Sequence, residues 1–112
     1  MAVIAVTKSN FEQVLAEKLP VVLAFSEEGD TLCRQQEAVL EELSGEFEGK
    51  VKFGRVDVNA DAALAFQYQV MALPLLVVME YGIFKGRAAG SCDREQILKL
   101  LESSVEQKDR VR

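Results

Sequence analysis

The sequence predicts an α/β domain, with a mixed central β-sheet of about five strands and helices on both faces. Short β-branched apolar runs alternate with segments of helical apolar spacing, in the order β-α-β-α-β-α-β-β-α. Strands separated by helices imply right-handed parallel crossovers, whereas a tight turn over residues 80–83 makes the last two strands antiparallel. The 112 residues suffice for one core, so residues 1–112 are expected to form a single domain.

The first elements are short. Residues 1–6 are apolar but lack a basic leader, which favours a first strand over a signal peptide. Ser9 and Glu12 have capping-box spacing, which predicts a helix over about residues 10–17. Pro20 separates this helix from the apolar run of residues 21–25, which is typical of a strand buried on both faces.

The middle of the chain alternates in the same way. Apolar residues at helical spacing predict a helix over residues 32–47, and Gly49 ends it. Residues 51–58 alternate like a strand. Residues 59–69 indicate a short helix that begins at Asp61.

The final third contains the hairpin and the last helix. Residues 75–79 predict a buried strand, and residues 84–88 its antiparallel partner, which Gly90 ends. Asp93 is the expected N-cap of the last helix. Residues 106–112 form a charged tail that is expected to fray.

The composition narrows the classes of function. Thirteen Lys and Arg against 18 Asp and Glu give a net charge of -5, which argues against nucleic-acid binding. The chain has no histidine and two cysteines, so zinc and copper lack their usual ligands, and no cofactor is expected. The longest apolar run, residues 70–79, contains Pro74 and is too short to span a bilayer, so no membrane association is expected.

The two cysteines, Cys33 and Cys92, lie far apart in the sequence. Two isolated cysteines do not form a secreted disulfide framework, so a reducing cytoplasm is the expected location. Cys92 directly precedes the Asp93 cap and is expected to be a surface residue without a role. A Cys33–Cys92 bridge is not expected.

The stretch Asp30-Thr31-Leu32-Cys33 lies where a buried strand passes through an acidic loop into a long helix. A helix N-terminus favours a thiolate, but the nearby carboxylates oppose it, and the sequence leaves open which effect prevails at Cys33. Asp30 is expected to be an N-cap that accepts an amide hydrogen bond from Leu32 or Cys33, and Thr31 is an equal candidate for this cap. The loop Glu27-Glu28-Gly29-Asp30 lacks the spacing of a calcium loop, so a solvated acidic loop is expected.

Four features occur together and in order along the chain. They are residues 21–33, the helix end at residues 41–50, the segment of residues 70–78 around Pro74, and the turn at Tyr81-Gly82 followed by Gly90. Together they resemble the thioredoxin family over roughly residues 3–105. The resemblance implies a thioredoxin-like fold, a cis peptide bond at Leu73-Pro74, and a part in cell redox homeostasis.

The departures from the family pattern bear directly on function. The family motif Trp-Cys-Gly-Pro-Cys aligns with residues 29–33, which places Asp30 at the nucleophilic first cysteine and Cys33 at the resolving one. The family's buried acid aligns with Ala24, its strand tryptophan with Ser26, and its active-site lysine with Arg55. The redox-active centre is therefore incomplete, and dithiol–disulfide oxidoreductase activity is not expected.

Three hypotheses follow from the resemblance. The first is a protein- or peptide-binding module whose groove pairs with the backbone of an extended partner and whose Asp30 favours a polar or basic group. The second is a monothiol redox protein in which Cys33 forms a mixed disulfide with glutathione or a partner protein. The third is a chaperone-like or assembly component. The groove is expected to consist of Asp30, Thr31, Leu32, Cys33, Leu73, Pro74 and Gly90.

Overall fold

Five strands form one sheet in the order β1-β3-β2-β4-β5. The computed structural model describes residues 3–16 and 18–105; the expected tail at 106–112 lies outside these residues. The elements are β1 (Ile4–Ala5), α1 (Phe11–Leu15), β2 (Val21–Ser26), α2 (Thr31–Glu46), β3 (Lys52–Asp57), α3 (Ala62–Gln67), β4 (Leu75–Glu80), β5 (Ile83–Ala89) and α4 (Arg94–Ser104). The predicted order of elements and the mixed sheet are confirmed.

The strand directions divide the sheet into two parts. β1, β3 and β2 are parallel, whereas β4 is antiparallel to β2 and β5 is antiparallel to β4. Of the three inner strands, β3, β2 and β4, the last two are buried almost throughout. Burial on both faces explains why their sequences are continuous apolar runs rather than alternating ones.

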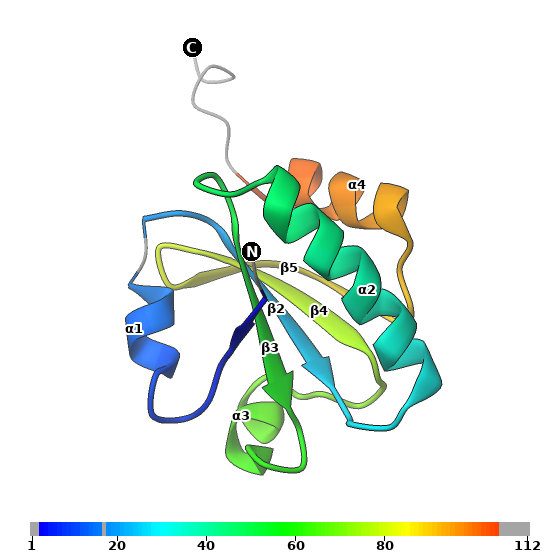
Figure 1. The fold of residues 1–112 in the computed structure, drawn as a ribbon. Helices are drawn as coiled ribbons and strands as arrows, with labels where there is room; N and C mark the ends of the chain where they lie inside the picture. The colour runs from blue at the N-terminus through cyan, green and yellow to red at the C-terminus, as the bar shows by residue number, and fades with distance from the viewer. Residues whose placement is uncertain (1–2, 17, 106–112) are drawn as a thin grey trace.

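Helices cover both faces of the sheet (Figure 1). α2 and α4 pack on one face, where Leu40 and Ile97 join the apolar side chains of β2 and β4. α1 and α3 pack on the other face, where Phe11 and Leu64 contribute to a second cluster. Within the described residues, no helix has the length and apolar character needed to cross a membrane.

The predicted capping box at Ser9 is wrong. The N-cap of α1 is Asn10, and its side chain makes no cap hydrogen bond to the helix. Instead, Asn10 Oδ1 accepts a hydrogen bond from the Thr7 amide at 2.7 Å, and the Ser9 hydroxyl lies 2.9 Å from the Thr7 hydroxyl. The polar side chains of this loop therefore stabilise the turn before α1, a local alternative that Ser and Asn favour.

The C-terminal half follows its predicted pattern closely. Tyr81 and Gly82 form the β4–β5 turn with φ values of 55° and 75°. Two consecutive positive φ values match the right-handed twist of a two-residue hairpin. Asp93 caps α4 as predicted, in a full capping box with Gln96. The Leu73-Pro74 peptide bond is cis, as the resemblance implies.

Candidate functional site

The loop after β2 places Asp30 at the head of α2. Gly29 has a φ of 90°, which an L side chain rarely adopts, and the Asp30 amide donates to the Glu27 carbonyl at 3.2 Å. Asp30 Oδ1 then accepts a hydrogen bond from the Cys33 amide at 2.9 Å. This bond lowers the pKa of the Asp30 carboxyl. The expected N-cap is confirmed, and the Cys33 amide is its donor.

Cys33 lies within the first turn of α2 and is buried, with 5% of its surface exposed. Burial raises the pKa of the Cys33 thiol, and the Asp30 and Glu27 carboxylates raise it further, against a backbone hydrogen bond at Glu27 that lowers it. The largest effect on the thiol pKa is thus burial, and the nearby carboxylates act in the same direction.

Pro74 and Gly90 lie together opposite the head of α2. The Gly90 amide donates to the Pro74 carbonyl at 2.8 Å. Pro74 also lines, with Cys33 and Ala24, a cavity of about 10 Å³, which is room for about one water molecule. The structure therefore brings Cys33, Pro74 and Gly90 into one region.

The other expected groove residues are more exposed. Leu73 and Asp30 line one open hollow of about 400 Å³, between α3 and the start of α2. Thr31 and Leu32 lie on the first turn of α2, where Leu32 has 49% of its surface exposed. Neither Thr31 nor Leu32 lines this hollow, so the structure brings together only part of the expected groove.

The position that aligns with the family's buried acid is apolar. Ala24 has 4% of its surface exposed and pairs in register with Arg55 of β3. Arg55 Nη1 binds Glu37 Oε2 of α2 at 2.6 Å, and each side chain is about a third exposed. Glu37 is a site residue that the sequence patterns did not indicate. Its position one helical turn after Cys33 was the available signal, because residues four apart lie on the same helix face.

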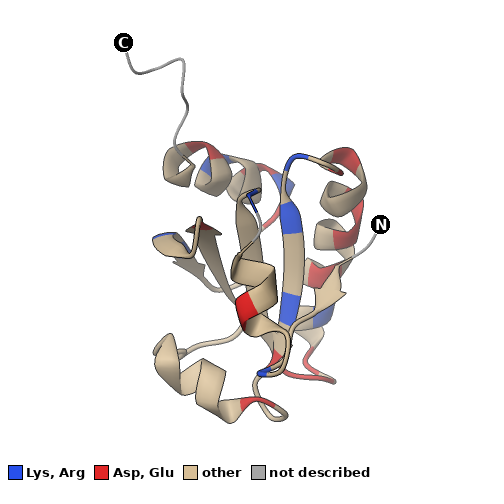
Figure 2. Ribbon diagram, turned by 90° about the vertical axis from the view of Figure 1, so that its left-hand side faces the viewer, with Lys and Arg blue, Asp and Glu red and all other residues tan. Residues whose placement is uncertain are grey.

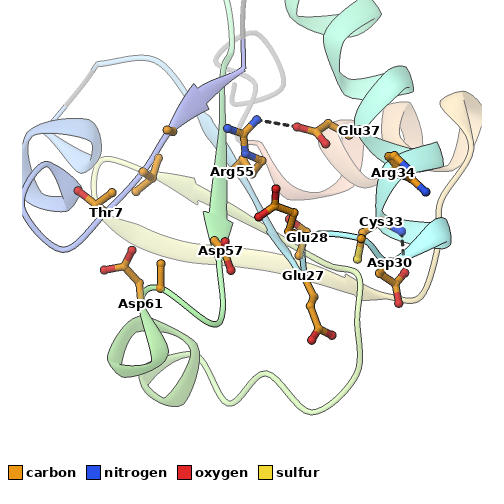
Figure 3. Close-up of a pocket in the computed structure, with 15 residues that line it drawn as sticks. Thr7, Glu27, Glu28, Asp30, Cys33, Arg34, Glu37, Arg55, Asp57 and Asp61 are labelled. Carbon is orange, nitrogen blue, oxygen red and sulfur yellow. Dashed lines mark hydrogen bonds and ion pairs between the residues drawn. The ribbon is translucent and has the colours of Figure 1, made fainter.

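A larger cavity, of about 490 Å³, lies at the edge of the sheet where β1, β2 and β3 end (Figure 3). Figure 2 shows acidic residues gathered in the loops at this end of the sheet. Six acidic and two basic side chains line the cavity, which we call the acidic cavity: Glu27, Glu28, Asp30, Glu37, Asp57, Asp61, Arg34 and Arg55. Among the described residues, no group of three or more acidic or cysteine side chains has the arrangement of a metal site.

Cys92 is not the surface residue that the sequence predicts. It is buried, with 7% of its surface exposed, and its amide donates to Oε1 of the buried Gln36 at 2.8 Å. Its sulfur lies 3.7 Å from the Gly90 carbonyl oxygen, and burial, followed by the charge of Asp93, raises the pKa of the thiol. Both Cys33 and Cys92 are free thiols. Gln36 explains the burial, because its amide replaces the water that would otherwise bind the Cys92 N–H.

The comparisons with known proteins match nearly the whole chain to one family. The family model described as Thioredoxin matches residues 2–103. The chain is 29% identical to the Thioredoxin of Staphylococcus haemolyticus over 105 residues, which cover 94% of this chain and 100% of that protein. It is 29% identical to Thioredoxin C-2 of Corynebacterium nephridii over 104 residues, 92% of this chain and 96% of the relative. It is 28% identical to a Thioredoxin of Staphylococcus aureus over 105 residues, 94% and 100% of the two chains.

Proposed function

This chain belongs to the thioredoxin family, and on that premise we propose that it is a non-catalytic module that binds an extended segment of a partner protein. One observation carries the proposal: Asp30, which the resemblance aligns with the family's nucleophilic cysteine, serves as the N-cap of α2 by accepting the Cys33 amide. The Asp30 side chain has a structural role as the helix cap. It contains no sulfur and therefore cannot take part in thiol–disulfide exchange.

The chemistry of exchange explains why Asp30 matters. A thiolate attacks one sulfur of the substrate disulfide, forms a mixed disulfide and expels the other substrate thiolate. A second thiol of the protein then displaces the bound substrate, and the protein keeps a disulfide while the substrate leaves fully reduced. Both steps need sulfur, and Asp30 leaves only Cys33 at this site.

The surroundings of Cys33 also disfavour its use alone. The thiolate is the attacking species, and burial holds the pKa of Cys33 above its ordinary value. Ala24 cannot accept a proton where the family has its buried acid, and Arg55 and Glu37, which line the same small cavity, are paired with each other. These features support a thiol that packs as a small apolar side chain.

The backbone before Pro74 supports a binding role. Among the described residues, neither the N–H nor the carbonyl of Leu73 has a hydrogen-bond partner. Unpaired backbone groups beside a groove can add an extended segment by strand-like pairing. The resemblance implies the same use, because in the family this backbone pairs with substrate peptide. The two free thiols support a reducing cytoplasm as the location.

Insulin reduction with dithiothreitol tests the loss of activity. We expect the wild-type rate to equal the background rate, whereas Asp30→Cys, which restores two sulfurs, should exceed it. Wild-type turnover comparable to that of a thioredoxin would overturn the proposal.

Intact mass after treatment with oxidised glutathione tests the monothiol alternative. We expect no adduct on the folded wild-type chain. One adduct that Cys33→Ser abolishes would favour the monothiol redox protein and reject the non-catalytic module.

A further inference from the structure

Two large apolar side chains are exposed in α3 and in the segment between α3 and Leu73. Phe66, near the end of α3, has 86% of its surface exposed, and Met71 has 92%. Both line an open hollow of about 540 Å³ that is formed by the end of α3 and the chain that follows it. Neighbouring exposed apolar side chains of this size are typical of interaction surfaces.

This apolar hollow continues towards the head of α2. Met71 and Val70 line both it and the neighbouring hollow of about 400 Å³, which also contains Leu73. The second hollow ends at the carboxylates of Glu27 and Asp30. An extended segment that pairs with Leu73 would therefore have an apolar surface on one side and acidic groups on the other.

Glu27 and Asp30 also line the acidic cavity, so the hollow that contains Leu73 and the acidic cavity adjoin at these two carboxylates. Of the two basic side chains in the cavity, Arg55 is already paired with Glu37, so Arg34 alone remains to balance the other five carboxylates. Within the part of the chain that the structure describes, Glu27, Glu28, Asp30, Asp57 and Asp61 form no ion pair. Unpaired like charges around one cavity repel each other, and a cation placed between them relieves the repulsion.

We infer, on the basis of the proposed function, that the groove selects a basic amphipathic segment of a partner protein. An apolar side chain of the segment lies against Phe66 and Met71, its backbone pairs with Leu73, and a Lys or Arg reaches Glu27, Asp30 and the acidic cavity. Charge complementarity favours such a partner over a second copy of this chain, which has a net charge of -5.

A peptide array tests this inference with the full-length wild-type chain. The probes are ten-residue peptides that contain one Leu and one Lys at varied spacing, with matched peptides in which Glu replaces Lys or Ser replaces Leu. We expect binding to the Leu-and-Lys peptides, weakened about tenfold by either replacement and weakened by added salt.

Four variants assign the contacts. Glu27→Lys should weaken binding of the Lys peptides about tenfold, and Phe66→Ser should weaken binding of all Leu peptides. Both positions are exposed, so neither variant should impair folding. Glu48→Lys, an exposed acid beyond the end of α2, is the matched charge control and should bind like wild type. Leu73→Arg should abolish binding.

The outcomes separate the inference from the proposed function. Binding that Leu73→Arg abolishes but that shows no preference for Lys would overturn the inference and leave the peptide-binding module standing. Absence of binding across the array would overturn both. Self-association in analytical ultracentrifugation that Phe66→Ser prevents would identify a second copy as the occupant and overturn the basic partner.

Discussion

Gln36→Leu tests whether the buried Gln36 side chain holds the chain before α4 against α2. Gln36 has 2% of its surface exposed, and its Oε1 accepts the buried Cys92 amide at 2.8 Å. Leucine has a similar volume but cannot accept a hydrogen bond, which leaves the Cys92 N–H unpaired. An unsatisfied buried amide costs about 1–3 kcal/mol. For 112 residues, unfolding entropy near 2.1 cal/mol/K per residue converts each ~1 kcal/mol into a Tm decrease of about 4 °C.

Urea unfolding and thermal melting measure this loss, with Gln35→Leu as the matched control. Gln35 is exposed on the same helix, so its replacement should change the unfolding free energy by less than about 0.5 kcal/mol. Maleimide labelling gives a second readout: Gln36→Leu should label Cys92 faster and leave Cys33 unchanged, because only Cys92 loses a hydrogen bond. Equal stability of the two variants would refute the structural role of the Gln36 amide.

Three further predictions follow from single contacts. The hydrogen bond from the Cys33 amide lowers the pKa of the Asp30 carboxyl from 3.8. The ionised carboxyl therefore stabilises the fold above pH 3.8, and this stability is lost as pH falls through the lower folded value. Asp30→Asn should flatten the acid side of the curve of Tm against pH. The pKa of Cys33 is raised from 9.0, chiefly by burial, so the stability linked to its protonated form is complete below pH 9.0 and lost as pH rises through the folded value. The rate of maleimide labelling of the folded chain, plotted against pH, should therefore have its midpoint above 9.0. A midpoint at or below this value would contradict the burial of the thiol. Gly54→Ala would place a Cβ 2.6 Å from a Val6 methyl carbon and should lower the unfolding free energy in urea by about 1–3 kcal/mol. Gly45→Ala, where α2 leaves open space, should raise the unfolding free energy by about 0.5–1 kcal/mol. An unchanged unfolding free energy for Gly54→Ala would show that β1 adjusts freely.

The elements that the sequence predicts best are those whose local and tertiary preferences agree. The apolar runs of β2 and β4 indicate strands buried on both faces, and the Tyr81-Gly82 turn and the Asp93 cap each satisfy local backbone requirements. The capping box at Ser9 failed because the hydroxyl and amide groups of that loop bind one another. Short polar side chains offer several local hydrogen bonds of similar strength, and the surrounding fold selects among them.

The candidate site divides in the same way. The Asp30 cap is a contact within one turn, so the sequence contained its full signal. The burial of Cys92 by Gln36 and the convergence of Asp57 with Glu27 join segments that are distant in the sequence. Their proximity depends on the strand order and on the packing of α2 over the sheet, which no local pattern encodes.

The aspartate over the first turn of α2 also determines how this chain meets small anions. A free helix start offers amide protons that draw in phosphate, sulfate or the carboxylates of a tripeptide. Here the Asp30 carboxylate accepts an amide hydrogen bond at this helix start. Because Asp30 is part of the chain, its effective concentration at this site does not fall when the protein is diluted. Small cellular anions should therefore bind poorly at the N-terminus of α2, and the acidic cavity beside it favours cationic groups.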